Sequence, residues 1–117
     1  MLSLGAGVRV FVGIEPVDMR GSFNALAGAV RRLGLEPTDG HLYLFFNRTR
    51  RLCKMVWFDG SGLCLFSKRL EAGTFELPQV ADGVNRVAVD QATLASLLEG
   101  IDLNARRRRW YRQQRAA

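Results

Sequence analysis

Few residues of this chain have the types and spacing that catalysis or metal binding requires. The two cysteines, Cys53 and Cys64, fall inside apolar strand-like runs that disfavour a reactive thiolate. The one histidine, His41, has no Cys or His at zinc-ligand spacing, and the carboxylates are scattered among turn and cap positions. Gly60 and Gly62 flank a turn that lacks the lysine and following helix of a phosphate-binding loop. We therefore predict no catalytic residue, no metal, no cofactor and no enzyme.

The charge distribution favours the binding of a polyanion. The chain of 117 residues carries a net charge of +6 at pH 7, from 17 basic and 11 acidic residues. Residues 106–115 read RRRRWYRQQR and contain no acid, so the whole excess of positive charge lies there and residues 1–105 are neutral. Arginine binds phosphate bidentately, and aromatic residues between arginines can stack on bases. DNA, contacted through its phosphate backbone, is the expected partner. The alternative is a disordered solubilising tail.

The residues predicted to bind nucleic acid lie in a hairpin and in the C-terminal segment. In the hairpin they surround the first turn and end the last strand, where the alternative is that they are simply solvated. The full set is Arg48, Arg50, Arg51, Lys54, Lys68, Arg69, Arg106, Arg107, Arg108, Arg109, Arg112 and Arg115.

The elements that position these residues follow from apolar periodicity and from turn signals. Helical spacing predicts a helix over 23–33, begun by Asp18 or Ser22 and ended by Gly34, and a second helix from Asp90 to Gly100. Strands are expected at 8–13, 41–47, 51–58, 63–69 and 84–89, with a possible edge strand at 74–77. The order β-α-β-β-β-β-α predicts an α+β domain over residues 1–105, built on an antiparallel meander and followed by a basic tail at 106–117.

The second hairpin turn fixes a register for its two strands. Placing Phe58 opposite Leu63 puts Trp57 opposite Cys64, and both faces of the hairpin are then largely apolar. We expect helix 23–33 to cover the face that carries Trp57, which would make Trp57 a core residue. The other face must be covered by the terminal strands or by a partner, for which a homo-oligomer formed through an apolar sheet face is one candidate.

Long stretches of the sequence resemble the small accessory protein TnpB of IS66-type bacterial insertion sequences. They read VDMRGSFNAL, GHLYLFFNRTRRLCKMVWFDGSGLCLFSKRLEAGTFELP and LLEGID. Leu103 stands where the family usually has tryptophan, and Gly21-Ser22 where it commonly has lysine-glycine. The residues that match family motifs include Asp18, Met19, Arg20, Trp57, Asp59, Gly60 and Gly62.

The resemblance implies a protein that is needed alongside the separate transposase of the same element, without catalysis by this chain. Two hypotheses follow: an accessory protein that binds DNA, or an adaptor that binds the transposase without touching DNA. An enzyme in its own right is the third and weakest. No apolar run is long enough to span a membrane and no secretory signal is evident, so we expect a cytoplasmic bacterial protein.

Overall fold

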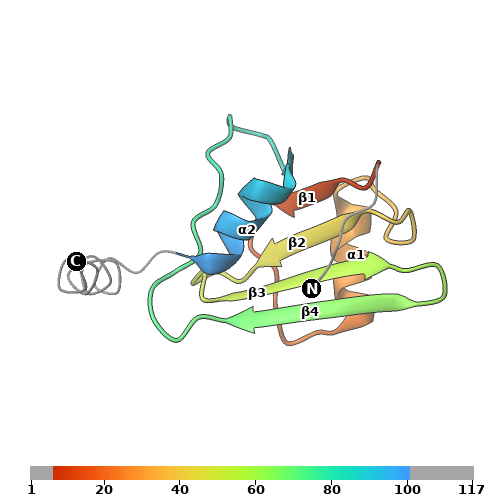
Figure 1. The fold of residues 1–117 in the computed structure, drawn as a ribbon, viewed down its shortest axis with the longest axis horizontal. Helices are drawn as coiled ribbons and strands as arrows, with labels where there is room; N and C mark the ends of the chain where they lie inside the picture. The colour runs from red at the N-terminus through yellow and green to blue at the C-terminus, as the bar shows by residue number, and fades with distance from the viewer. Residues whose placement is uncertain (1–6, 101–117) are drawn as a thin grey trace, which may run out of the picture.

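The computed structural model describes residues 7–100, and the arginine-rich segment predicted as a tail lies outside this range. A five-stranded sheet with the order β4-β3-β2-β1-β5 forms the centre, with one helix on each face (Figure 1). In chain order the elements are β1 (Val10–Gly13), α1 (Phe23–Arg32), β2 (Leu42–Phe46), β3 (Leu52–Phe58), β4 (Leu63–Arg69), β5 (Arg86–Val89) and α2 (Gln91–Glu99). The predicted α+β class and element order are confirmed.

The antiparallel meander of β2, β3 and β4 has the predicted register. Trp57 pairs with Cys64 and Phe58 with Leu63, as the turn chemistry indicated. Two pairings were not anticipated. Strand β1 runs antiparallel to β5, and it runs parallel to β2, with Val10 beside Leu42, where α1 forms the connection. Parallel neighbours need such a crossover, because a tight turn can join only antiparallel strands.

The helix ends were predicted well, with one error. Gly34 follows α1 with a φ of 80° and Gly100 follows α2 with a φ of 71°, a conformation that glycine adopts without a Cβ clash. Asp90 caps α2 by accepting a hydrogen bond from the Thr93 amide at 2.7 Å. The residue at the N-cap of α1 is Ser22, although its side chain makes no capping bond. The suggestion that Asp18 caps α1 is wrong, because its carboxylate binds Arg20 ahead of the helix.

Each helix covers one face of the sheet, and α1 does not cover the face that was expected for it. Helix α1 packs through Leu26 and Val30 against the face that carries Tyr43 and Val56. Helix α2 covers the opposite face, where Leu94 and Leu97 join a core that includes Cys53 and Met55. In Figure 1, α2 lies in front of the sheet and α1 behind it. The apolar periodicity of a helix shows that it buries one side, whereas the connection lengths and packing decide which sheet face receives it.

Trp57 and Phe66 are only half-buried, so the prediction that both are core residues is wrong. They pack at the border of the α2-side core, toward the β4 edge of the sheet.

Residues 70–85 form a long connection between β4 and β5, and the edge strand suggested at 74–77 does not form. Instead Phe75 is fully buried and packs on Phe46, with 5.3 Å between ring centroids. Its amide donates to the carbonyl of Arg50 at 2.7 Å, which ties this connection to the β2–β3 turn. Neither helix in residues 7–100 is long and apolar enough to cross a membrane.

Candidate nucleic-acid interface

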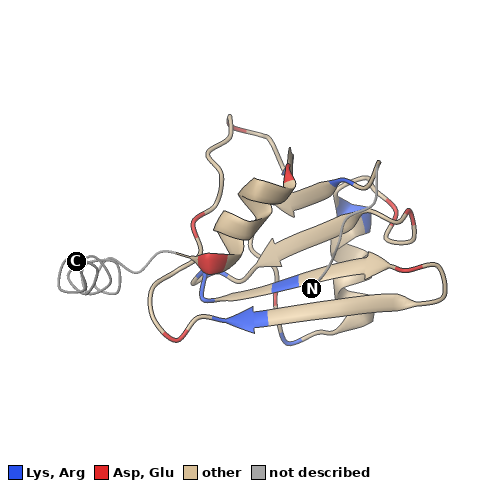
Figure 2. Ribbon diagram, viewed as in Figure 1, with Lys and Arg blue, Asp and Glu red and all other residues tan. Residues whose placement is uncertain are grey.

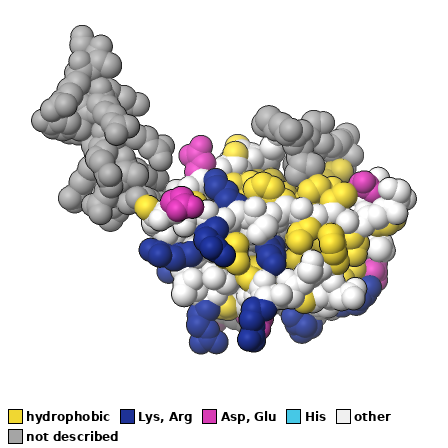
Figure 3. All heavy atoms as spheres, turned by 90° about the horizontal axis from the view of Figure 1, so that it is seen from below, with side chains coloured by type: hydrophobic (Ala, Val, Ile, Leu, Met, Phe, Trp, Pro, Cys, Tyr) yellow, Lys and Arg dark blue, Asp and Glu magenta, His cyan; other side chains and the backbone are white. Residues whose placement is uncertain are grey.

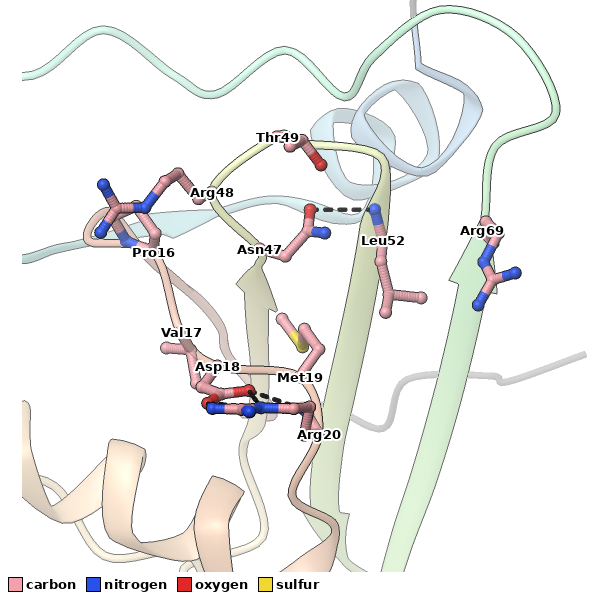
Figure 4. Close-up of a pocket in the computed structure, with 10 residues that line it drawn as sticks. All are labelled: Pro16, Val17, Asp18, Met19, Arg20, Asn47, Arg48, Thr49, Leu52 and Arg69. Carbon is pink, nitrogen blue, oxygen red and sulfur yellow. Dashed lines mark hydrogen bonds and ion pairs between the residues drawn. The ribbon is translucent and has the colours of Figure 1, made fainter.

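A groove of about 640 Å³ opens at one end of the sheet, between the loop that precedes α1, the β2–β3 turn and the end of β4 (Figure 4). We call it the basic groove. Its lining consists of Pro16, Val17, Asp18, Met19, Arg20, Asn47, Arg48, Thr49, Leu52 and Arg69. Three segments that are far apart in the sequence therefore meet here. Each of them contributes one arginine, and each had been singled out in the sequence as a family motif or a basic cluster.

The loop that carries the Asp18-Met19-Arg20 motif is held to the sheet by three hydrogen bonds. The amide of Val17 donates to the carbonyl of Phe46 at 2.9 Å. From β3, the Lys54 ammonium donates to the carbonyls of Met19 at 2.8 Å and Gly21 at 3.0 Å. Met19 is buried against the α1 side of the core, which holds the loop from within. The position of Arg20 at the groove is thus fixed by the fold.

Asp18 and Arg20 form a close ion pair at the mouth of the groove. The Arg20 Nη2 lies 2.6 Å from Asp18 Oδ2, and Nε contacts both carboxylate oxygens. These hydrogen bonds lower the pKa of the Asp18 carboxyl from 3.8 to about 2. The prediction that Arg20 has a charged partner is confirmed, although Arg20 precedes α1 and does not lie in its first turn. This pair is neutral as a whole, so the net positive charge of the described groove lining comes from Arg48 and Arg69.

The β2–β3 turn that presents Arg48 is organised by Asn47. Its Oδ1 accepts hydrogen bonds from the amides of Arg51 at 3.0 Å and Leu52 at 3.1 Å, and its carbonyl accepts from the Arg50 amide. Arg50 adopts a φ of 56°, in the left-handed region that a non-glycine residue enters at some cost. The role of Asn47 was missed in the sequence, although an asparagine directly after a strand is a recognisable turn signal.

The basic residues predicted to bind nucleic acid have different surroundings. Arg48 and Arg69 are exposed and line the basic groove, while Arg50 and Arg51 are exposed on the adjoining turn. Lys68 donates to the carbonyl of Leu98 at 2.7 Å and so anchors the end of α2. Figure 2 shows Lys and Arg at the end of β4 and at the start of β3.

The structure supports a DNA contact for some of these basic residues and not for others. The ammonium groups of Lys54 and Lys68 already serve the fold, so a DNA contact from either stays a prediction without structural support. The arginines from 106 to 115 lie outside the described residues. The cations placed at the groove are Arg20, Arg48 and Arg69.

The motif residues Asp59, Gly60 and Gly62 lie in the turn between β3 and β4, at the end of the hairpin that is away from the groove (Figure 1). Asp59 Oδ1 accepts from the amides of Ser61 at 2.9 Å and Gly62 at 3.0 Å, and these bonds lower the pKa of Asp59 to about 2. Gly60 has a φ of 105°, which only glycine adopts easily. These residues, with the half-buried Trp57, shape the β3–β4 turn.

The groups that could support catalysis or metal binding are dispersed through the fold. His41 Nδ1 accepts from the Arg9 amide at 2.9 Å. Burial raises the pKa of the Cys53 thiol to about 11, and burial together with the neighbouring Asp59 raises that of Cys64. Among residues 7–100 there is no group of His, Cys, Asp and Glu that could hold a metal ion.

Comparison with known proteins gives one family. The family model described as IS66 Orf2-like protein matches residues 8–108. Two proteins of Sinorhizobium fredii, both termed uncharacterized, are similar over nearly their whole length. The protein y4hO is 41% identical over 111 residues, which cover 94% of this chain and 95% of that protein. The protein y4jC is 32% identical over 103 residues, which cover 87% and 86% of the two chains. No solved structure matches.

Proposed function

The chain belongs to the family of IS66 Orf2-like proteins, accessory proteins of insertion sequences, and we propose from this premise that it binds DNA through the basic groove while it acts with a separate transposase. The observation that carries the proposal is that Arg48 and Arg69, which come from distant segments, line one groove beside the Arg20–Asp18 ion pair. The one acid in its described lining, Asp18, is paired with Arg20.

The chemistry of the groove suits a phosphate backbone. Guanidinium groups offer several N–H donors in a plane and form bidentate contacts with phosphate oxygens, which lysine cannot do. Because Arg48 and Arg69 are exposed and have no carboxylate partner among the described residues, they keep their donors available for a ligand. The arginine-rich segment at 106–115 adds charge that strengthens attraction to DNA of any sequence.

A DNA titration at several salt concentrations tests the proposal. Each phosphate that the protein neutralises contributes about −0.9 to the slope of log affinity against log salt. The double variant Arg48→Gln/Arg69→Gln should therefore bind more weakly, with a slope shallower by about 2. A chain truncated after residue 105 should lose most of its non-specific binding, because four to six arginines would account for a slope of about −4 to −5.

A matched control separates the groove from net charge alone. Arg9→Gln/Arg32→Gln removes the same charge from exposed positions that do not line the groove. The proposal requires the groove pair to matter more than this control pair. If both pairs weaken binding equally, the groove is not a binding site. If the full chain binds the transposase but no DNA, the adaptor role is correct.

A further inference from the structure

The side-chain amide of Asn47 is engaged by the fold through its oxygen only. Its Oδ1 accepts hydrogen bonds from the amides of Arg51 at 3.0 Å and Leu52 at 3.1 Å. Because both partners are N–H donors, the atom that faces them must be the oxygen, which fixes the orientation of the carboxamide. Its Nδ2 carries two N–H donors and has no acceptor among the residues drawn in Figure 4, where Asn47 lines the basic groove.

The other turn of the meander shows that a carboxylate can serve the same structural purpose. Asp59 Oδ1 accepts from the amides of Ser61 at 2.9 Å and Gly62 at 3.0 Å, which is again one side-chain oxygen bound by two backbone amides. The turn at Asn47 therefore does not require an amide side chain. Compared with aspartate, asparagine adds two N–H donors and carries no negative charge. Both properties suit an anion in the groove.

Asn47 and Arg69 lie on the same face of the sheet, on either side of Leu52. The register that pairs Phe46 with Cys53 continues to Asn47 opposite Leu52, and Leu52 pairs in turn with Arg69. Neighbouring strands are about 4.8 Å apart, so the backbones of Asn47 and Arg69 are about 10 Å apart, a gap that the long arginine side chain can narrow.

The arginines of the groove lie to either side of Asn47. Figure 4 shows Asn47 between Arg48 and Arg69. Figure 3, which views the molecule from the β4 side, shows Lys and Arg side chains gathered around the end where β4 terminates, with acidic side chains at its upper left. An anion held by the two groove arginines would therefore lie beside the Nδ2 of Asn47.

We propose that Asn47 binds DNA directly, by donating from its Nδ2 to a non-bridging oxygen of a backbone phosphate that lies between Arg48 and Arg69. This inference rests on the proposed DNA-binding function of the groove and adds to it a neutral residue that a search for charge does not find. A neutral amide contributes direction, since a hydrogen bond weakens steeply away from linear geometry, and so sets the position of the phosphate between the two cations.

A phosphate fits this position better than a base does. Asparagine reads adenine with both of its side-chain atoms, Oδ1 and Nδ2, and here Oδ1 is occupied by two backbone amides. No aromatic side chain belongs to the described lining of the groove, so a base would find no ring to stack on. The contact is therefore expected to be the same for DNA of any sequence.

The variant Asn47→Asp removes the donors and keeps the turn. It retains Oδ1 for the amides of Arg51 and Leu52, so urea denaturation should show the stability of the parent chain. The matched control, Gln91→Glu, makes the same amide-to-carboxylate change at an exposed position that begins α2 and does not line the groove. In titrations of the full chain with short duplexes of unrelated sequence, Asn47→Asp should bind each duplex at least about tenfold more weakly than Gln91→Glu.

The salt dependence separates the lost donors from the added negative charge. Log affinity is linear in log salt, and repulsion between exposed charges is largely screened at about 1 M, where the Debye length is about 3 Å. Extrapolated to about 1 M salt, Asn47→Asp should still bind about tenfold more weakly than Gln91→Glu. If the two variants converge there, the effect is repulsion alone and the proposed hydrogen bond does not exist.

Nuclear magnetic resonance of the parent chain gives a second readout that does not depend on the folding of a variant. When a duplex is added, the Nδ2 proton signals of Asn47 should shift more than those of Asn24 and Asn85, which do not line the groove. Shifts no larger than theirs would overturn the proposal. So would a folded Asn47→Asp chain that binds as tightly as Gln91→Glu.

The arginine variants show which proposal has failed. If the groove pair Arg48→Gln/Arg69→Gln weakens binding more than its control pair while Asn47 gives a negative result, the groove binds DNA without Asn47. If the groove pair matters no more than its control pair, the groove is not the DNA site, and the proposed function fails together with this inference.

Discussion

The β3–β4 hairpin has two ends, and they use their polar residues in opposite ways. At the turn end, the Asp59 carboxylate is taken up by the amides of Ser61 and Gly62. At the groove end, Arg48 and Arg69 project from exposed positions and have no carboxylate partner among the described residues. Both ends belong to segments that resemble the family. The polar groups of the turn end bond to one another, whereas Arg48 and Arg69 at the groove end keep their N–H donors free of any carboxylate among the described residues.

At the groove end, the lysines bind the protein's own backbone, whereas Arg48 and Arg69 have no carboxylate partner among the described residues. The ammonium groups of Lys54 and Lys68 donate to backbone carbonyls and fasten the motif loop and the end of α2. An ammonium group on a flexible stem suits such a point contact, while the planar guanidinium suits a phosphate. A count of basic residues in the sequence therefore overstates the number available to the proposed DNA contact, because Lys54 and Lys68 are engaged by the fold.

The largest expected effect is the loss of stability on replacing Phe75, which lies beside the groove end of the hairpin. It is fully buried in the α2-side core against Phe46, and its amide donates to the carbonyl of Arg50 on the turn beside the groove. Phe75→Ala should lower the free energy of unfolding by about 3–5 kcal/mol, as measured by urea denaturation. Trp57→Ala, at a half-buried position toward the turn end, should cost less than about 2 kcal/mol. Equal losses would show that the two ends are not supported differently.

Lys54→Met tests whether this lysine serves the fold or a ligand. The substitution keeps most of the apolar stem but removes the donor to the carbonyls of Met19 and Gly21. Hydrogen bonds to charged groups contribute about 1.5–3 kcal/mol, so a loss of stability in this range is expected. The salt slope of DNA binding should change less than in Arg48→Gln/Arg69→Gln. If the variant is as stable as the parent chain but its DNA binding has a shallower salt slope, Lys54 contacts DNA and does not mainly support the fold.

Local patterns predicted a large part of this fold. The β3–β4 register followed from one turn, and the ends of both helices followed from Gly34, Asp90 and Gly100, because each signal acts within a few residues of itself. The parallel pairing of β1 with β2 was not predicted, and the sheet face predicted for α1 was wrong. They depend on contacts between segments tens of residues apart, which leave no local signature.

The candidate site was predicted as separate pieces. Arg48 and Arg69 were named from their charge and Arg20 from its motif, but nothing in the sequence showed that the three meet at one groove. Phe75 was missed because a lone aromatic in a polar connection has no periodicity to reveal its burial. Asn47 was missed because its side chain acts on the backbone of residues that follow a turn.

The smallest expected effect concerns acid stability at the two ends. Asp59 and Asp18 both have a pKa lowered from 3.8 to about 2, Asp59 by backbone amides and Asp18 by Arg20. A carboxyl whose pKa is lowered by folding contributes stability that is fully present above its unfolded value, here 3.8. That contribution is lost as the pH falls toward 2. The melting temperature is therefore expected to decline as the pH falls from 3.8 toward 2.

Replacing each aspartate by asparagine sharpens the comparison. Asparagine keeps an Oδ1 acceptor for the amides of Ser61 and Gly62, so Asp59→Asn should preserve the turn and lower the melting temperature only slightly at pH 7. Asp18→Asn removes the negative charge that is paired with Arg20 and so raises the net positive charge of the groove. It should therefore strengthen DNA binding at low salt, where Asp59→Asn should not. Both variants should show a flatter decline of melting temperature between pH 4 and pH 2 than the parent chain, as measured by circular dichroism. If Asp59→Asn strengthens DNA binding as much as Asp18→Asn, the acid at the turn end lies within reach of the DNA, and the functional distinction between the two ends of the hairpin does not hold.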